Sequence, residues 1–242
     1  TKKKDFKTFK VLFLDGKLFF TEGFMYRYLP YFQKLNEIIH NKSLGNIISL
    51  ESNFNVKIYK QMKFFGINFK KPDFSNRFFN KNLGGGAILD LGCYPLSLST
   101  FINSITWNVK IDKIELQKID KSYCDSGVEI YSSAELNFDN NFIAKITCSF
   151  KDKLNQNTKI NFDHGSINIG ETWVPNKNKA IELNDMNGKT KINFNNKDNI
   201  YSYQIRSISD QLLNNIENPI FPSMTMEEIE VNTNIIEKWV EY

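Results

Sequence analysis

The 242-residue sequence has few of the residues that most often bind metals or form disulfides. It contains two histidines, His40 and His164, too few for a three-histidine zinc site. Its three cysteines, Cys93, Cys124 and Cys148, show no C-x-x-C spacing, so neither a disulfide framework nor a zinc knuckle is indicated. We therefore expect no metal centre, and the cysteine content fits a reducing, cytoplasmic environment.

Long hydrophobic runs and a strong excess of one charge are also absent. No apolar stretch approaches the roughly 20 residues that span a bilayer, and no small-residue cleavage site follows the lysines at the start of the chain. The formal net charge of +4 is weak for a dedicated nucleic-acid binder. Residues 57–81 interleave lysines with aromatics, which is compatible with single-stranded nucleic acid, but the weak charge favours a solvated loop. We expect neither a membrane nor a nucleic-acid partner.

The pattern of apolar residues in the first half of the chain predicts helices and one strand. Residues 11–14 and 18–21 fit two short extended pieces around Asp15-Gly16, with a frayed helix as the alternative. Helical spacing begins at Pro30 and stops by Gly45, and alternation over 46–56 predicts a strand with one covered face. An irregular stretch, 57–83, follows.

The second half of the chain begins with an apolar segment whose length predicts a helix. This segment, Ala87–Phe101, contains Gly92 and Pro95, which should loosen one turn. The strands that follow are marked by alternation near 109–116, 128–136, 142–150, 158–162, 166–169, 180–183 and 191–194. One closing helix presents apolar residues at Ile205, Ile208, Leu212 and Ile216, and a second opens with Thr225 and Glu228 as a capping box. The pattern predicts an α+β fold with an open, mostly antiparallel mixed sheet that helices cover on one face.

The common nucleotide and hydrolase motifs are missing. A dinucleotide fingerprint that starts at Gly84 and Gly86 would need its third glycine where Leu89 stands. The sequence also lacks a phosphate-binding P-loop, a G-x-S-x-G elbow and an H-E-x-x-H helix. Any chemistry must therefore come from other groups.

The run from Gly84 to Pro95 is the densest group of candidate residues. On a helix Asp90 and Tyr94, four residues apart, project from the same face, so a carboxylate and a phenol would meet in apolar surroundings. The structural alternative is that Asp90 caps a turn and Tyr94 is a core residue with a satisfied hydroxyl. Spacing alone leaves both interpretations open.

This run and three other segments resemble the Gfo/Idh/MocA oxidoreductases, most closely the xylose and dihydrodiol dehydrogenase-like members. The other segments are Glu22-Gly23-Phe24-Met25-Tyr26-Arg27-Tyr28-Leu29-Pro30, then Leu44-Gly45-Asn46-Ile47, and Asn218-Pro219 before the last helix. They follow the family order over about residues 18–242.

The resemblance implies a two-domain enzyme that binds NAD or NADP in an N-terminal Rossmann domain. Residues 1–22 are then a remnant of that domain, and 23–242 are a substrate and oligomerisation domain like the C-terminal domain of glyceraldehyde-3-phosphate dehydrogenase. The family's Glu-Lys-Pro motif, which supplies an active-site lysine, is absent, and Lys70-Lys71-Pro72 lies in the wrong place. A phenol near its usual pKa of about 10 needs a neighbouring cation to become phenolate, and that lysine is the expected cation.

The same resemblance assigns roles to particular residues. Tyr94 is the expected general acid or base, and Asp90 orients it or the substrate. Arg27, Tyr28 and Arg77 are the expected contacts to a sugar-like substrate, although either arginine could simply pair with a carboxylate.

Two functions from different classes follow. The first is an NAD(P)-dependent oxidoreductase of sugar-like or diol substrates, present as its substrate domain and inactive alone. The second is a non-catalytic module whose open sheet face joins copies of the chain into a homo-oligomer.

Overall fold

An eight-stranded sheet forms the centre of the computed structural model, which describes residues 3–15, 18–59, 62–64, 67–70, 72–107, 114–151, 156–174 and 178–242. The strand order is β10-β9-β8-β7-β1-β6-β5-β4. Neighbouring strands are antiparallel except β1 and β6, which are parallel. The predicted mixed, mostly antiparallel sheet is confirmed. The strands are β1 (Ile47–Asn55), β4 (Ile114–Tyr123), β5 (Glu129–Phe138), β6 (Ile143–Ser149), β7 (Thr158–Phe162), β8 (Gly165–Ile169), β9 (Asn178–Asp185) and β10 (Gly188–Asn195).

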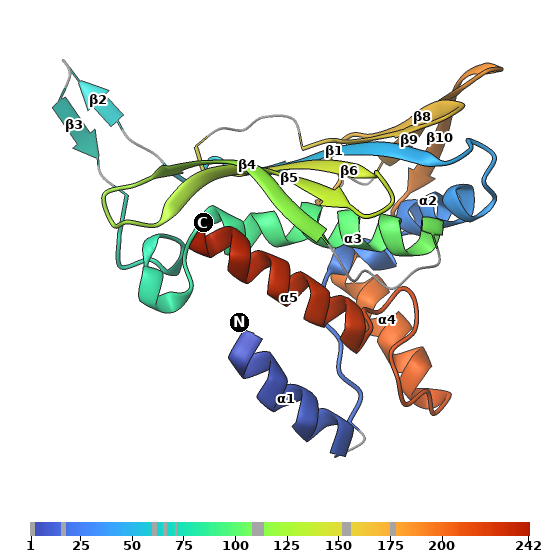
Figure 1. Ribbon diagram of the computed structural model, residues 1–242, viewed down its shortest axis with the longest axis horizontal. Coiled ribbons are helices and arrows are strands. Elements are labelled where there is room, and N and C mark those ends of the chain that lie inside the picture. Colours follow the sequence, from blue (N-terminus) through green and yellow to red (C-terminus); the bar gives the residue numbers. More distant parts are fainter. Residues whose placement is uncertain are drawn as a thin grey trace.

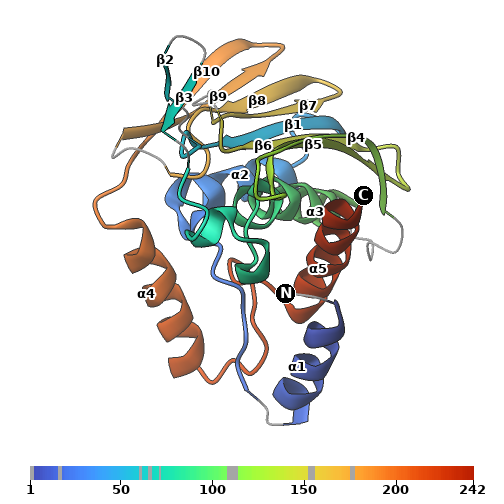
Figure 2. The same ribbon diagram turned by 90° about the vertical axis from the view of Figure 1, so that its left-hand side faces the viewer.

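Helices lie along one face of this sheet. Helices α2, α3 and α5 lie beneath it, whereas α1 and α4 stand further from it (Figure 1). In the part of the chain that the structure describes, no helix covers the opposite face (Figure 2). The predicted one-sided covering is therefore confirmed. The helices are α1 (Lys3–Asp15), α2 (Pro30–His40), α3 (Cys93–Trp107), α4 (Ile200–Leu213) and α5 (Met226–Glu241).

Local sequence signals explain where two of these helices begin. Pro30 occupies the first turn of α2, where its missing N–H leaves no hydrogen bond unmade. At the start of α5, Thr225 Oγ1 accepts the backbone N–H of Glu228 at 3.2 Å, and Glu228 Oε2 accepts the N–H of Thr225 at 2.8 Å. The predicted capping box is confirmed.

The predictions for the N-terminal segment need correction. Residues 11–14 belong to helix α1, so the extended interpretation is wrong and the helical alternative is correct. Phe6 of this helix is buried, and Lys10 Nζ lies 2.5 Å from Glu230 Oε2 on α5. Residues 18–21 form no strand, since no described strand lies beside them to complete a ladder.

Two further segments differ from their predictions. The stretch 57–83 is not wholly irregular, because β2 (Met62–Phe64) and β3 (Ile67–Lys70) pair antiparallel and two short helical turns follow, η2 (Arg77–Phe79) and η3 (Lys81–Leu83). Val109 and Ile111, predicted to begin a strand, lie outside the described residues. The described part of that strand begins at Ile114.

The apolar face predicted for α4 is largely exposed to solvent. Ile205 is 66% exposed and Leu212 is 51% exposed, while Ile216 lies beyond the end of the helix at Leu213. Helical spacing identified the helix, but it did not identify a buried face. This face of α4 therefore has no covering layer among the described residues.

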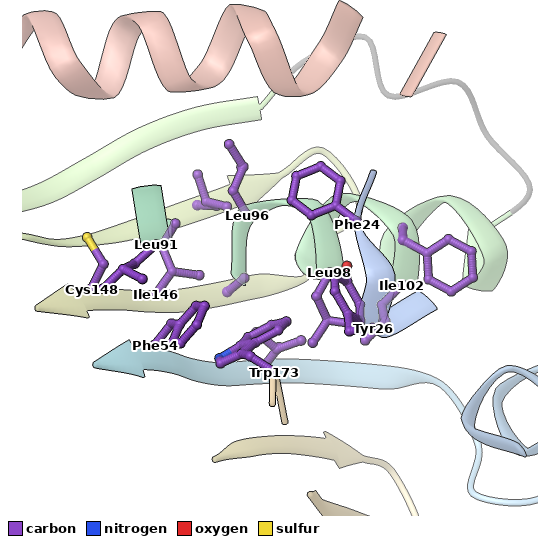
Figure 3. Close-up of a cluster of buried hydrophobic side chains, with 14 of the residues drawn as sticks. Phe24, Tyr26, Phe54, Leu91, Leu96, Leu98, Ile102, Ile146, Cys148 and Trp173 are labelled. Carbon is purple, nitrogen blue, oxygen red and sulfur yellow. The ribbon is translucent and has the colours of Figure 1, made fainter. Parts of the chain in front are cut away.

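The core between sheet and helices is rich in aromatic rings. Phe54 and Trp173 stack at 5.7 Å, and Tyr26 packs edge-on against Trp173 at 5.1 Å (Figure 3). Trp173 is fully buried, and its Nε1 donates to the carbonyl oxygen of Asn53 at 2.7 Å, so its one polar atom is satisfied. These rings form the floor on which the start of α3 rests.

Candidate active site

A π-helical turn, η4 (Ile88–Gly92), carries Asp90 and leads directly into α3. The backbone before it requires glycine: Gly86 has a φ of +124°, and a Cβ there would lie 2.2 Å from Glu129 Oε1. Glu129 Oε1 accepts the backbone N–H of Ile88 at 3.2 Å, and burial raises the pKa of this carboxyl. The predicted loosening of one turn near Gly92 is thus confirmed as a π turn, anchored by a side chain of β5.

Asp90 and Tyr94 line one cavity of about 390 Å³. The cavity lies between the segment before the short helical turn η1 (Met25–Tyr28), the start of α3 and one face of α5. Its wall consists of Glu22, Gly23, Phe24, Leu89, Asp90, Cys93, Tyr94, Leu96, Asn232, Thr233 and Ile236. A carboxylate and a phenol therefore face a common space with apolar walls, as binding pockets usually have.

The Tyr94 ring is held by aromatic neighbours on two sides. Phe24 and Phe54 both pack edge-on against it at 5.1 Å. The hydroxyl contacts the sulfur of Met25 at 3.5 Å, a weak acceptor. Burial, followed by the charges of nearby acidic groups, raises the pKa of Tyr94, so the phenol keeps its proton at neutral pH.

Arg77 neutralises Asp90 from the solvent side. Its guanidinium donates to Asp90 Oδ1 at 2.6 Å and lies over the Phe78 ring at 4.2 Å. The Arg77 side chain is more than half exposed, whereas that of Asp90 is mostly buried. Arg77 thus acts on the cavity through Asp90 and does not itself line it.

The other two predicted substrate contacts lie in the protein core. Arg27 is 1% exposed, donates to Glu228 Oε1 at 3.0 Å and lies over the Phe101 ring at 4.7 Å. Tyr28 is buried and donates to Ser223 Oγ at 3.0 Å. Neither residue lines the cavity with Tyr94, so this geometry gives no support to their predicted substrate contact.

Three polar residues of the cavity were not singled out from the sequence. Glu22 belongs to the motif Glu22–Pro30, but no role was assigned to it. Asn232 and Thr233 lie among the apolar positions of the last helix, where polar residues interrupt the helical spacing. That interruption is the available signal in the sequence. It indicates a cavity-lining position only because α5 packs beside α3.

Other kinds of site are not evident in the described part of the chain. Its residues include no group of three or more His, Cys, Asp and Glu side chains placed to hold a metal ion. None of its helices is both long and apolar enough to cross a membrane.

The chain thus combines a mixed sheet covered on one face with a carboxylate and a phenol near the start of α3. The model of the GFO/IDH/MocA C-terminal domain matches residues 32–168, which is more than half of the sequence. The chain therefore belongs to the GFO/IDH/MocA family.

Similar proteins include a D-xylose 1-dehydrogenase (NADP(+)) 2 of Haloferax volcanii, 24% identical over 70% of this chain and 46% of the relative. A trans-1,2-dihydrobenzene-1,2-diol dehydrogenase of Xenopus tropicalis is 29% identical over 35% of this chain and 22% of the relative. The structure of KijD10, a 3-ketoreductase from Actinomadura kijaniata with NADP and TDP-benzene, superimposes with a TM-score of 0.78 at 15% identity, covering 98% of this chain and 66% of that one. The chain thus spans less than half the length of the curated relatives it matches.

Proposed function

We propose that this chain is the substrate domain of an NAD(P)-dependent oxidoreductase that acts on sugar-like or diol substrates. The observation that carries the proposal is the cavity shared by Tyr94 and Asp90. The relatives support it, since they include an NADP-dependent D-xylose dehydrogenase and a dihydrodiol dehydrogenase. A bound nicotinamide cofactor would supply the hydride chemistry for such substrates, and a protein group would exchange the proton of the reacting hydroxyl.

Tyr94 is the proton-exchanging group in this proposal, and Asp90 positions it or the substrate. Because burial raises the pKa of Tyr94, its hydroxyl is protonated and donates to a substrate carbonyl oxygen in the reductive direction. Proton uptake in the oxidative direction requires a cation near the phenol. No arginine, lysine or histidine is among the described residues that line the cavity.

The residues present do not fit a dinucleotide. The sequence lacks the glycine-rich turn that cradles a pyrophosphate, so we derive no step through NAD or NADP within these 242 residues. We propose that residues 1–22 belong to the nucleotide-binding domain and that 23–242 form the substrate domain. The exposed apolar side chains of the first segment support this division, because Val11, Leu12 and Leu18 are each more than half exposed.

The experiment is to express the full open reading frame that contains this chain and to follow the reduction of NADP⁺ or NAD⁺ in the presence of D-xylose. Substrate-dependent formation of the reduced cofactor is the expected result. An open reading frame without a nucleotide-binding domain, together with no turnover, would refute the proposal. The 242-residue chain alone should bind neither cofactor.

The alternative function, a homo-oligomerisation module, is favoured by the uncovered face of the sheet. The register there aligns one residue from each strand in a row across the whole sheet, with mostly alternating charges. The row is Gln117, Glu135, Lys145, Glu51, Lys159, Asn168, Glu182 and Lys191. Its three glutamates and three lysines cancel, so the row carries no net charge that would repel the same row of a second copy.

Light scattering during size-exclusion chromatography tests this association. We expect a dimer that Lys145→Glu dissociates, because the reversed charge then faces like charges in the row. Lys34→Glu, on the solvent side of α2, is the control and should leave the dimer intact. A monomeric wild-type chain would refute association through this face. Neither result decides the oxidoreductase proposal.

A further inference from the structure

We infer that Glu22 and Asn232 form a hydroxyl-binding subsite in the Tyr94 cavity, selective for a neutral polyhydroxylated ligand over an anionic one. This inference rests on the proposed function, which it deepens by naming the charge class of the substrate. Nothing in the sequence motifs assigns either residue a role.

The electrostatics of the cavity argue against an anionic ligand. Asp90 is already paired with Arg77 at 2.6 Å, and Arg77 lies outside the cavity wall. Among the described lining residues the charged groups are Glu22 and Asp90, both acidic, and none is basic. A ligand that carried a carboxylate or phosphate here would meet the negative charge of Glu22, with no basic side chain among the described lining residues, in a partly desolvated space.

Glu22 supplies the strong acceptor. Its carboxyl accepts no hydrogen bond from the described residues, and burial raises its pKa. Glu22 lines the same cavity as Cys93 and Tyr94 at the start of α3, and burial, then the charge of Glu22, raises the pKa of the Cys93 thiol. A ligand hydroxyl that donates to this carboxylate would supply the missing partner.

Asn232 supplies a second polar group. It is 7% exposed and lines the cavity from α5. Its Oδ1 lies 2.9 Å from Thr100 Oγ1, while its Nδ2 has no partner among the described residues. Exchanging the amide oxygen and nitrogen would satisfy Nδ2 and leave Oδ1 unpaired instead, so one end of the amide lacks a partner in either orientation.

The remaining walls suit a sugar ring. Phe24, Leu89, Leu96 and Ile236 present apolar surface, which matches the C–H faces of a pyranose, while Tyr94 and Thr233 add hydroxyls. A volume of about 390 Å³ lies at the lower end of the range for small-molecule pockets. Neutral hydroxyls, which both donate and accept, are complementary to this set of groups.

A pair of sugars that differ by one carboxylate tests the inference. D-Xylose is D-glucuronate without the carboxylate on C5, so we would titrate each into the 242-residue chain and follow backbone amide shifts by NMR. D-Xylose should shift the amides of 89–94 and 232–233, and D-glucuronate should bind at least about tenfold more weakly. Glu22→Gln should weaken D-xylose by about tenfold and reduce the discrimination between the two sugars.

Two further variants make the result specific. Asn232→Ala should weaken both sugars equally, since it removes a neutral partner, and Glu241→Gln at the exposed end of α5 should change neither affinity. A well-dispersed spectrum shows that each variant is folded. Absence of D-xylose shifts at the cavity, equal binding of both sugars, or unchanged discrimination in Glu22→Gln would each overturn the inference. Because the titration needs no dinucleotide, its outcome is independent of whether the full protein turns over NADP⁺.

Discussion

Arg27 is a charged side chain enclosed by the protein core, and among the described residues it forms an ion pair with Glu228. The same glutamate closes the capping box of α5, so a single carboxylate joins the segment before α2 to the start of the last helix. Removing one member of a buried pair leaves an uncompensated charge, which costs more than the pair itself contributes.

We predict that Glu228→Gln lowers the free energy of unfolding by about 3–5 kcal/mol, because Arg27 would remain buried without its counter-charge. Urea denaturation measures this change. Glu37→Gln is the matched control, since its partner Lys34 is exposed, and it should change stability by no more than about 0.5 kcal/mol. Similar values for both variants would contradict the structural role of Arg27.

Gly86 is the residue on which the position of Asp90 depends. Gly86→Ala should destabilise the fold by about 2–4 kcal/mol, because the new Cβ clashes with Glu129 and the backbone has a positive φ. Gly170→Ala serves as the control, since a Cβ there meets no atom within 4 Å. Equal stability of the two alanine variants in thermal unfolding would refute the close approach of Glu129.

Lys179 gives a prediction about pH. This lysine of β9 is 4% exposed and lies over the Tyr31 ring at 5.0 Å, and burial lowers its pKa to about 8 from the ordinary 10.5. Between these values the unfolded chain binds more protons than the folded one, so this lysine makes stability rise with pH across that window.

Lys179→Met should remove this contribution and stabilise the protein at pH 7 by about 1–3 kcal/mol. Denaturation is measured at a series of pH values, and the stability curve of the variant is subtracted from that of the wild type. The difference isolates the contribution of Lys179, because other titrating groups are common to both proteins and cancel. The exposed Lys34→Met should leave the curve unchanged. A wild-type and a Lys179→Met curve that stay parallel between pH 8 and 10.5 would contradict the lowered pKa.

Part of the site could be predicted from single residues and their spacing in the sequence. Asp90 and Tyr94 stand at helical spacing behind three glycines, a local signal visible in the sequence. Arg27 and Glu228 are about 200 residues apart, and Glu22 and Asn232 are similarly distant. No local pattern reveals such pairs, because the chain reversals that join them depend on the whole sheet.

Among the elements, α4 and α5 differ in how deeply their apolar residues are buried. Ile229 of α5 is 1% exposed, whereas Ile205 of α4 is 66% exposed. Ile229→Ala should therefore destabilise by about 2–5 kcal/mol, while Ile205→Ala should cost no more than about 0.5 kcal/mol. Equal losses in urea denaturation would show that α4 packs against the core more closely than the structure indicates.

Helical spacing predicted α4 and α5 equally well. Such spacing shows that a helix has an apolar stripe, but it does not show whether another element packs against that stripe. Strand alternation was more informative, because a period of two already separates the covered face from the open one. The π turn at Ile88–Gly92 was anticipated only as a loosened turn, since its form depends on Glu129 from another element.

At the scale of the whole molecule, the sheet order and the parallel pairing of β1 with β6 could not be derived from local patterns. Both arise because β1 is inserted between β6 and β7, strands that follow it by about 100 residues. The α+β class and the one-sided covering followed from the succession of elements alone. The cavity at the start of α3 lies on the helical side of this sheet, where Glu22 and one face of α5 complete its wall.

The account depends most directly on the hydroxyl of Tyr94. Steady-state kinetics of the full open reading frame with D-xylose should show that Tyr94→Phe lowers kcat by about 100- to 10,000-fold with little change in KM, because only the proton transfer is lost. The matched control Tyr123→Phe, on the exposed side of β4, should behave as wild type. Full activity in Tyr94→Phe would contradict the account.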